Sequence, residues 1–242
     1  MSNLNTTHQF DVVIVGSGGA GLSLALSLPQ HFKIAVLAKS TLTEASTFYA
    51  QGGVAAVLDE TDSIEQHIDD TMIAGAQLCE LDAVKQTVEG GKPSVDFLLN
   101  NGVQFTLDEQ LQLHLTREGG HSQRRIIHAA DATGRAISTT LVQRAQEKDN
   151  ITIFENFIAI DLITSQKLGL EESHNRALGL YALDEKTEEV HTFLAPFTAL
   201  ACGGAMKAYL YTSNPDIATG DGIAMAYRAG CRVANMEFNQ FH

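Results

Sequence analysis

Hydrophobic residues near the start of the chain form two short runs on either side of a glycine-rich turn. Val12–Val15 is apolar at every position, a pattern typical of a strand buried on both faces. A second strand is expected over 33–37, which is apolar after Lys33, and the largely apolar segment 22–28 ends before Pro29, which predicts a helix. Strand, turn, helix and strand in this order predict a βαβ unit of a parallel sheet.

The rest of the hydrophobic pattern predicts further elements along the chain. Helices are expected over 64–75, 82–89, 94–101, 135–147 and 223–229, and strands over 151–154, 156–164, 177–184 and 196–201. Two of these strands, 156–164 and 177–184, predict a small sheet of their own. We therefore expect an α/β fold, Rossmann-like, with a parallel sheet and a small accessory sheet.

The segment 40–53 shows neither helical nor strand periodicity. It is polar and rich in glycine, and it contains the aromatic pair Phe48 and Tyr49 and a glycine doublet. Loops of this length in a compact domain usually serve a function or are disordered. We interpret the segment as a loop that wraps a ligand; a packed connector is the alternative.

The turn between the first two strands carries three glycines in G-x-G-x-x-G spacing. Gly16 allows the tight turn, Gly18 allows a pyrophosphate to approach the backbone, and Gly21 allows the helix to pack on the strand. The helix N-terminus then offers free N–H groups to phosphates. The pattern indicates a dinucleotide site, with a purely structural turn as the alternative. Because Lys39 stands where an acid usually binds the ribose, the motif leaves NADP and FAD open.

Two further polar features are candidate sites. The stretch 113–128 gathers histidines, arginines and a glutamate around a glycine pair, which predicts a polar active-site edge for a small anionic ligand. The spacing of its histidines is not that of a metal site. His67 lies on an apolar helical stripe and is expected to be packed. Asp221 is either the N-cap of the last helix or a cofactor contact.

Composition narrows the class of protein. The chain has 242 residues and a formal net charge of −13, which argues against a general nucleic-acid surface. Its 3 cysteines are odd in number and far apart, which does not suit a disulfide framework, and they predict buried or partly buried free thiols in a reducing cytoplasm. We see no signal peptide and no apolar run long enough to span a membrane, so we expect a cytoplasmic protein without membrane contact.

Five segments together resemble one family. They are GSGGAGLSLAL (16–26), STFYAQGGVAAV (46–57), HLTREGGHSQRRIIHAADATGR (114–135), NPDIATGDGIAMAYRAG (214–230) and NMEFNQFH (235–242). In these segments the chain resembles the N-terminal part of the L-aspartate oxidases, a family of the succinate dehydrogenase and fumarate reductase flavoproteins. The resemblance implies FAD as cofactor. Relatives with covalent FAD carry a histidine where this chain has Ser46, so the resemblance implies non-covalent FAD.

The resemblance also implies roles for individual residues. The turn from Gly16 to Gly21 holds the FAD pyrophosphate through Ser17, Gly18, Gly19 and Ala20, and Lys39 lies along the adenosine. The isoalloxazine is wrapped by Ser46, Thr47, Phe48, Tyr49, Ala50, Gln51, Gly52 and Gly53, and Asp221 is a further FAD contact. Glu118, Gln240 and His242 line the substrate pocket. Glu118 stands where the reductases are apolar, and it can pair with the ammonium group of aspartate. The alternative is that Glu118 only braces the turn, against Arg117 or Arg124.

The implied reaction is hydride transfer from the α-carbon of L-aspartate to the flavin, which gives iminoaspartate, with oxygen or fumarate as the acceptor. Iminoaspartate feeds quinolinate synthesis for NAD, which implies a functional link to quinolinate synthase. A fumarate reductase or succinate dehydrogenase flavoprotein is the first alternative. A non-catalytic nucleotide-binding fragment is the second.

Members of the family are about twice as long as this chain. We therefore expect a fragment in which 1–236 is most of the FAD-binding domain, still incomplete, and 237–242 begins the capping domain. The family's catalytic arginine and further substrate anchors would follow His242. On its own, such a fragment is expected to be inactive.

Overall fold

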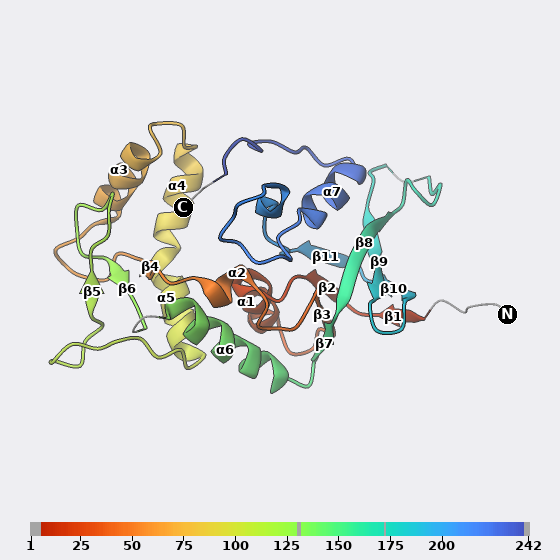
Figure 1. Cartoon of the computed structure of the whole chain (residues 1–242), viewed down its shortest axis with the longest axis horizontal. Helices are drawn as coiled ribbons and strands as arrows, with labels where there is room; N and C mark the ends of the chain where they lie inside the picture. Colours follow the sequence, from red (N-terminus) through yellow and green to blue (C-terminus); the bar gives the residue numbers. More distant parts are fainter. Residues whose placement is uncertain (1–5, 130–131, 172, 240–242) are drawn as a thin grey trace. The chain divides into compact units, whose positions relative to one another are not determined.

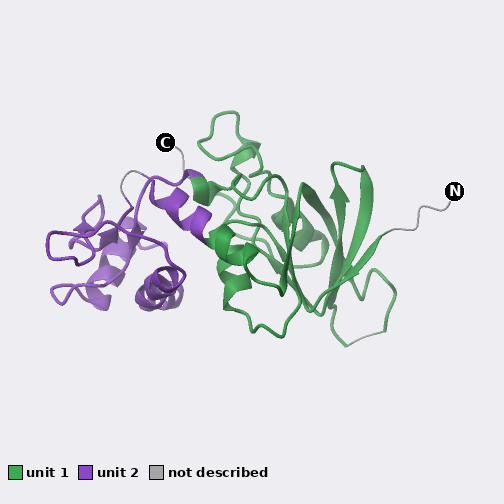
Figure 2. Cartoon of the chain, turned by 90° about the horizontal axis from the view of Figure 1, so that it is seen from below, with its two compact units in different colours: residues 1–48, 141–242 green, residues 49–140 purple. Residues whose placement is uncertain are grey.

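The computed structural model describes residues 6–129, 132–171 and 173–239, and the chain divides into two compact units (Figures 1 and 2). Unit 1 comprises 1–48 and 141–242, and unit 2 comprises 49–140. Each unit is described by itself below. The sequence boundaries fall at the end of the short helix α2 (Ser46–Tyr49) and within helix α6 (Thr133–Gln146).

Unit 1 contains a parallel sheet with strand order β11-β2-β3-β7. Its strands are β2 (Val12–Val15), β3 (Ile34–Ala38), β7 (Ile151–Glu155) and β11 (Phe197–Leu200). The two central strands are buried along their whole length, which explains their unbroken apolar sequences. Helix α1 (Gly19–Ser27) connects β2 to β3 and packs on both, so the predicted βαβ unit is confirmed.

A second sheet of unit 1 has strand order β1-β10-β9-β8. Its strands are β1 (Thr7–Gln9), β8 (Phe157–Thr164), β9 (Ala177–Asp184) and β10 (Glu189–Leu194). β8, β9 and β10 pair antiparallel in sequence order, and β1 pairs parallel with β10. The predicted accessory sheet is therefore confirmed, although the sequence pattern did not reveal β1 or β10.

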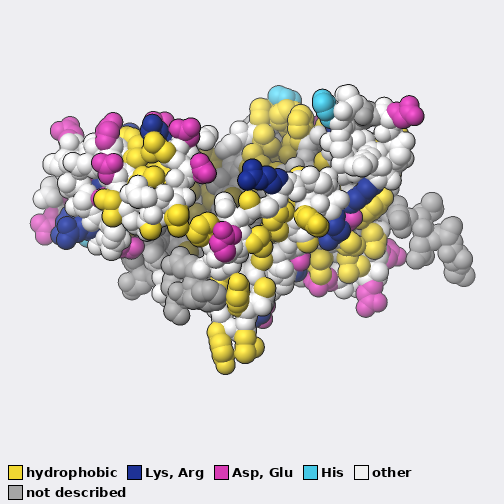
Figure 3. Space-filling model, turned by 90° about the horizontal axis from the view of Figure 1, so that it is seen from above, with side chains coloured by type: hydrophobic (Ala, Val, Ile, Leu, Met, Phe, Trp, Pro, Cys, Tyr) yellow, Lys and Arg dark blue, Asp and Glu magenta, His cyan; other side chains and the backbone are white. Residues whose placement is uncertain are grey.

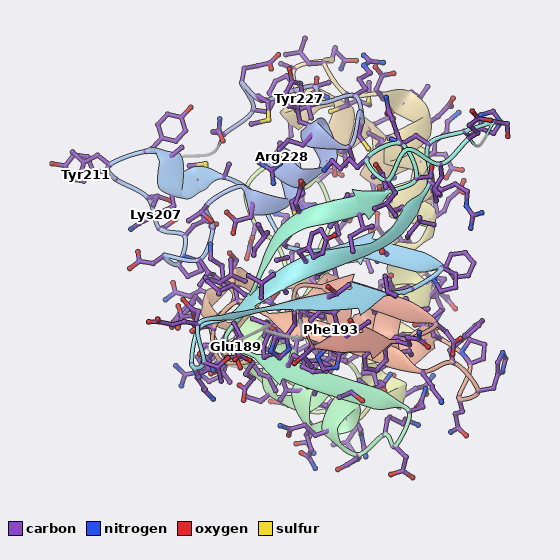
Figure 4. The ribbon with its side chains drawn as sticks, turned by 90° about the vertical axis from the view of Figure 1, so that its right-hand side faces the viewer. Glu189, Phe193, Lys207, Tyr211, Tyr227 and Arg228 are labelled. Atoms are coloured by element: carbon purple, nitrogen blue, oxygen red, sulfur yellow. The ribbon has the colours of Figure 1, made fainter. Side chains whose placement is uncertain are left out.

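The core of unit 1 lies between these two sheets. Alternate residues of the parallel sheet, among them Val13 and Leu37, pack against β8, β9 and β10. Phe193 of β10 is completely buried in this layer, and Figure 4 shows it among the strands. Met225 of helix α7 (Asp221–Arg228) closes the same cluster. Successive side chains of a strand point to opposite faces of the sheet. Every second residue of β2 and β3 therefore faces the accessory sheet.

One loop of unit 1 adds no burial to this core. It follows the short 3-10 helix η1 (Met206–Ala208) and carries Tyr209, Leu210 and Tyr211. Leu210 is 86% exposed and Tyr211 is 83% exposed. Figure 4 shows Tyr211 at the end of a projecting loop, and Figure 3 shows exposed hydrophobic side chains in several groups on one face. No described helix is long and apolar enough to cross a membrane.

Unit 2 contains three helices of its own, the first part of α6 and a small sheet. The helices are α3 (Ile64–Ala74), α4 (Leu81–Glu89) and α5 (Gly91–Asn100). The sheet has strand order β4-β6-β5, with β4 (Val54–Ala55), β5 (Leu115–Thr116) and β6 (Ile126–Ile127). Ser63 caps α3 by accepting a hydrogen bond from the Gln66 N–H, as its position before the apolar stripe suggests.

Most predicted elements are confirmed within a few residues, with two corrections. The segment 40–53 is not wholly irregular, because 46–49 forms the one-turn helix α2. The helix expected at 94–101 begins at Gly91, so that Pro93 lies inside its first turn. Proline fits there because the first turn has no hydrogen-bonded N–H to lose.

Two glycines of the turn are required by close backbone approach. A Cβ on Gly21 would overlap the carbonyl oxygen of Gly16, and a Cβ on Gly16 would overlap that of Ala201. Gly16 also has a φ of +119°, which side-chain-bearing residues rarely adopt. Both glycines are therefore structural, as their predicted roles in the turn and in packing require.

This close approach leads to a prediction on stability. Gly21→Ala should destabilise unit 1 by about 3 kcal/mol, because α1 must move away from the turn. Gly204→Ala is the matched control, since a Cβ there meets nothing within 4 Å. Thermal unfolding of the cofactor-free protein measures both. Equal melting temperatures for the two variants would contradict this explanation of Gly21.

Candidate functional site

A cavity of about 270 Å³ lies in unit 1 at the carboxyl ends of the parallel strands. Ligands of open α/β sheets bind at this end of the strands. The wall combines the 16–20 turn, the end of β3, the start of α2, the glycines after β11 and the start of α7. Its residues are Val15, Gly16, Ser17, Gly18, Gly19, Ala20, Leu37, Lys39, Glu44, Ala45, Ser46, Thr47, Phe157, Ala159, Ala201, Cys202, Gly203, Gly204, Ile217, Ala218 and Asp221.

Gly18 and Gly19 differ from the structural glycines of the same turn. A Cβ on Gly18 would lie 3.5 Å from the Thr47 hydroxyl oxygen and 3.9 Å from Ala45, which is ordinary contact. The fold therefore tolerates a side chain at Gly18, but that side chain would occupy the cavity wall. The Thr47 hydroxyl also accepts a hydrogen bond of 3.0 Å from the Gly19 N–H, which ties the short helix α2 to the start of α1.

The start of α1 favours an anionic ligand. Its first turn contains no acidic residue, and its N-cap, Gly18, provides no side-chain hydrogen bond. The partial positive charge of the helix N-terminus is therefore not neutralised by an acid of the first turn. A phosphate at the cavity would meet backbone N–H groups and no opposing carboxylate from this helix.

Lys39 and Asp221 form an ion pair on the cavity wall, with 2.6 Å between Nζ and Oδ2. Lys39 Nζ also donates to Thr219 Oγ1 at 2.6 Å, and the Thr219 hydroxyl donates to Asp221 Oδ1 at 2.9 Å. The interpretation of Asp221 as N-cap is wrong, because Gly220 is the N-cap and Asp221 lies in the first turn. No acid directly follows β3 in the sequence, but Asp221 of α7 places a carboxylate beside Lys39 at the end of this strand.

Cys202 is the cavity's thiol. It follows β11 and is about half-buried against Gly222, whose position leaves no room for a Cβ. Burial raises the pKa of Cys202, and the nearby Asp221 carboxylate raises it further. The thiol is therefore held neutral and is a weak nucleophile. All three cysteines are free, but Cys231 is exposed, in contrast to the expectation of at least partial burial.

The structure brings only part of the predicted cofactor set to this cavity. Nine predicted residues line it: Gly16, Ser17, Gly18, Gly19, Ala20, Lys39, Ser46, Thr47 and Asp221. Gly21 lies beneath the turn, and Phe48 is outside the lining. Tyr49, Ala50, Gln51, Gly52 and Gly53 belong to unit 2. A Cβ on Gly53 would overlap the backbone of β6, which gives this glycine a structural role.

Sequence reasoning missed several wall residues. The glycine doublet Gly203 and Gly204 after the strand expected at 196–201 indicated a ligand at this edge of the sheet, but the sequence assigned no cofactor role to it. Phe157 and Ala159 come from the accessory sheet, and nothing in their local pattern indicates a site. Their position at the cavity depends on how the second sheet packs on the first.

Glu118 of unit 2 lies in the loop 117–125 between β5 and β6. Its side chain is exposed, and no residue in the described part of the chain forms a hydrogen bond or ion pair with its carboxylate. The alternative in which Glu118 braces the turn against Arg117 or Arg124 therefore finds no support in the described contacts. Gln240 and His242, the other predicted substrate residues, lie outside the described residues.

Arg125 is completely buried, so the predicted anion-binding role of the arginine cluster is wrong for this residue. Its guanidinium forms a two-pronged ion pair with Asp62, through Nε to Oδ2 at 2.8 Å and Nη2 to Oδ1 at 2.7 Å. Nη1 donates to Asp70 at 2.8 Å. Asp70 also accepts two hydrogen bonds from Ser122, from its N–H and its hydroxyl. A buried arginine without these partners would destabilise the unit by about 3–5 kcal/mol.

His67 is buried beside this ion-pair network, as its apolar stripe predicts. Its ring and that of His121 have centroids 5.7 Å apart, and the Nδ1 atoms of both are buried without a hydrogen-bond partner among the described residues. Burial lowers the pKa of His67, with smaller lowering effects of Arg125 and His121. The pair His114 and His128 is hydrogen-bonded at 2.9 Å. In the described ranges, no histidine, cysteine or acid gathers in a metal-binding group.

The βαβ turn, a helix start without an acid in its first turn and the cavity at the strand ends are features of a nucleotide-binding α/β protein. The sequence profile of the FAD-binding domain family matches residues 11–242. The chain belongs to this family, and its cofactor is FAD.

Curated relatives carry the name L-aspartate oxidase. The chain is 85% identical to the L-aspartate oxidase of Acinetobacter baylyi over 242 residues, which is 100% of this chain and 44% of that protein. It is 57% identical to the L-aspartate oxidase of Pseudomonas aeruginosa, covering 97% of this chain and 45% of that protein. The chain thus spans less than half the length of these relatives.

Among solved structures, E. coli quinol fumarate reductase FrdA is similar, with a TM-score of 0.85 and 32% identity. That match covers 92% of this chain and 37% of the other. The Sdh1 complex of Mycobacterium smegmatis gives a TM-score of 0.84 at 30% identity, covering 93% of this chain and 39% of the other. These likenesses confirm the predicted fold class and the flavoprotein superfamily.

The buried histidine generates a prediction on pH dependence. Because the folded-state pKa of His67 is lowered, the unfolded chain takes up a proton first as the pH falls through its ordinary value of about 6.5. The free energy of unfolding should therefore fall as the pH decreases below that value.

Asp70 affects stability in a separate, lower pH range. Burial opposes the ionisation of its carboxyl group, but Ser122 and Arg125 outweigh burial and lower its pKa. Its contribution is lost only as the pH falls through the acid range.

The measurement is urea unfolding of wild type and His67→Leu between about pH 7.5 and 5.5. The slope of unfolding free energy against pH should be smaller in the variant. His174→Leu, at an exposed position, is the control and should keep the wild-type slope. An unchanged slope in His67→Leu would show that His67 is not the buried titrating group.

Proposed function

We propose that the cavity of unit 1 holds the FAD, with its pyrophosphate at the 16–20 turn. The carrying observation is a backbone cradle at Gly18 and Gly19, next to a helix N-terminus without an acid in its first turn. Lys39 is already paired with Asp221, so backbone N–H groups and the helix dipole supply the stabilisation of the phosphates. Lys39, Asp221 and the start of α2 complete the wall along the cofactor.

The FAD is held without a covalent bond in this proposal. Ser46 stands where covalent relatives carry a histidine, and no histidine is found among the described residues of the wall. Cys202 provides the wall's thiol, but its raised pKa keeps it neutral and poorly nucleophilic. Binding then depends on shape, hydrogen bonds and the helix dipole alone.

We further propose that the complete enzyme oxidises L-aspartate to iminoaspartate, with oxygen or fumarate as the acceptor. The support is 85% identity to a curated L-aspartate oxidase across the whole chain. FAD supplies the redox chemistry when bound, by accepting two electrons and a proton from the substrate. The chain's own part is to bind and orient the amino acid. Glu118 is the proposed partner of its ammonium group, because its exposed carboxylate has no partner among the described residues.

A fumarate reductase or succinate dehydrogenase flavoprotein is the competing function, because solved structures with these names share the fold. Two residues favour the oxidase. Ser46 replaces the histidine of covalent relatives, and Glu118 is a carboxylate where they are apolar. A dicarboxylate substrate without an amine has no ammonium group to pair with Glu118. Its own negative charges would instead repel the Glu118 carboxylate.

Further parts of the proposal rest on the relatives alone. Gln240 and His242 are proposed substrate contacts, with a boundary near residue 236 between the FAD-binding domain and the capping domain. The product would pass to a condensing enzyme of the quinolinate synthase kind. The free thiols favour a cytoplasmic location.

The cradle leads to a prediction on cofactor binding. Gly18→Ala should fold normally, because its Cβ makes only ordinary contacts, but it should raise the dissociation constant of FAD at least about tenfold. The larger Gly18→Val should purify without yellow colour. Quenching of flavin fluorescence on titration measures the affinity, and circular dichroism checks folding. A folded Gly18→Val protein with full FAD would rule out this position for the pyrophosphate.

Glu118 leads to a prediction on substrate choice. In the complete gene product, Glu118→Gln keeps the size of the side chain and removes its charge. It should lower kcat/KM for L-aspartate about a hundredfold, because the buried ammonium of the substrate loses its partner. Fumarate reduction should fall far less, since fumarate carries no amine.

Both activities are measured on one flavin-loaded preparation, and Glu109→Gln, on another exposed part of unit 2, is the control. Equal losses of the two activities would remove Glu118 from the substrate site. A Glu118→Gln protein with unchanged aspartate turnover would do the same.

A further inference from the structure

The loop 117–125 reaches from β5 to β6 and has little regular structure of its own. The strands at its ends pair through only two residues each, Leu115 with Ile127 and Thr116 with Ile126. Gly119 and Gly120 follow Glu118 directly, and Gly120 has a φ of +84°. A loop with adjacent glycines and short flanking strands has many accessible conformations. Something outside the loop must hold it in one of them.

Helix α3 and the residue before its N-cap provide that restraint. Asp70 Oδ2 accepts hydrogen bonds from the Ser122 N–H at 2.7 Å, the Ser122 hydroxyl at 2.8 Å and Arg125 Nη1 at 2.8 Å. Asp62 takes the other side of the same guanidinium in a two-pronged pair. We call Asp62, Asp70, Ser122 and Arg125 the loop clamp. It fixes the second half of the loop at two points.

Burial makes the ion pairs of the loop clamp rigid. The side chain of Arg125 has no exposed surface, that of Asp62 is 1% exposed and that of Asp70 is 14% exposed. Charged hydrogen bonds shielded from water are stronger than those at the surface, and they allow little departure from their geometry. His67 of α3 and His121 of the loop pack against each other, with ring centroids 5.7 Å apart. The loop is thus attached to α3 by charge and by packing.

We infer that the loop clamp is a positioning device that sets the substrate choice of Glu118 without touching the substrate. This inference rests on the proposed function of Glu118 and names the residues that make that function work. A carboxylate discriminates an ammonium group only when it is held within hydrogen-bond reach of it, and a displacement of about 1 Å is enough to lose most of the effect. The clamp supplies the fixed end from which the glycine turn presents Glu118.

The test loosens the clamp and leaves Glu118 in place. Asp70→Asn removes the charge that Arg125 and Ser122 share, and Ser122→Ala is a milder change that removes a single hydrogen bond. In the complete, flavin-loaded gene product, Asp70→Asn should lower kcat/KM for L-aspartate at least about tenfold, chiefly through KM. Fumarate reduction and FAD content should stay near the wild-type values. Asp69→Asn, an exposed neighbour on the same helix, is the matched control.

A double-mutant cycle separates positioning from simple damage to the fold. If the clamp acts through Glu118, then Asp70→Asn and Ser122→Ala should cause no further loss in the Glu118→Gln background. Hydrogen exchange of the backbone over 117–125 should rise in both clamp variants and not in Asp69→Asn. Because Ser122→Ala removes only one exposed hydroxyl, it keeps the test available if Asp70→Asn folds poorly.

Four results would overturn the inference. Equal losses of aspartate oxidation and fumarate reduction would show a structural role only. If Glu118→Gln lowers aspartate turnover and the clamp variants lower it further by their full single-mutant effect, the clamp does not act through Glu118. The proposed function of Glu118 would then remain intact. A harmless Glu118→Gln would remove the proposed function of Glu118 and the inference with it. Unchanged hydrogen exchange in both clamp variants would show that the loop is held by other contacts.

Discussion

The nucleotide site depends on how closely the backbone of α1 approaches the turn that precedes it. Gly21 has no space for a Cβ because the carbonyl of Gly16 lies there, and Gly16 has none because β11 ends beside it. This contact fixes the start of α1 over the carboxyl ends of β2 and β11. The first residues of α1 therefore line the cavity; the Gly19 N–H donates to Thr47, and the other N–H groups of the first turn are the ones we propose for a phosphate. Without this approach, the same residues would form a helix and a sheet but no cradle.

Unit 2 depends on a different interaction, a buried ion-pair network that holds a loop. Its loop 117–125 is long, contains adjacent glycines and is bounded by strands of two residues, so backbone pairing alone cannot fix it. A buried arginine with two carboxylates does so instead. Such a network contributes little net stability compared with apolar packing, but it specifies one arrangement and strongly disfavours others. The charged residues Asp62, Asp70 and Arg125 thus mainly hold one conformation of the loop, and Glu118, with its exposed carboxylate, is the residue that we propose for substrate binding.

The sequence was sufficient to predict the elements whose structure depends on residues close together in the chain. The strands at 12–15 and 34–38 are apolar throughout because both faces are buried, and the glycine spacing revealed the turn. It was insufficient where the cause is distant in the chain. β1 and β10 are recognisable only once they pair with each other. Asp221 and Lys39 form an ion pair although they are 182 positions apart in the sequence. Arg125 resembled a ligand-binding arginine because nothing local shows that Asp62 and Asp70 bury it.

We propose that the cradle at Gly18 and Gly19 binds one FAD without a covalent bond. Acid precipitation of the purified flavoprotein tests it most directly, because acid unfolds the protein and releases any cofactor that only the fold retains. The account predicts that all of the yellow colour enters the supernatant and is identified there as FAD, in an amount equal to the protein. Flavin that stays with the washed precipitate, or a supernatant that contains no FAD, would contradict it.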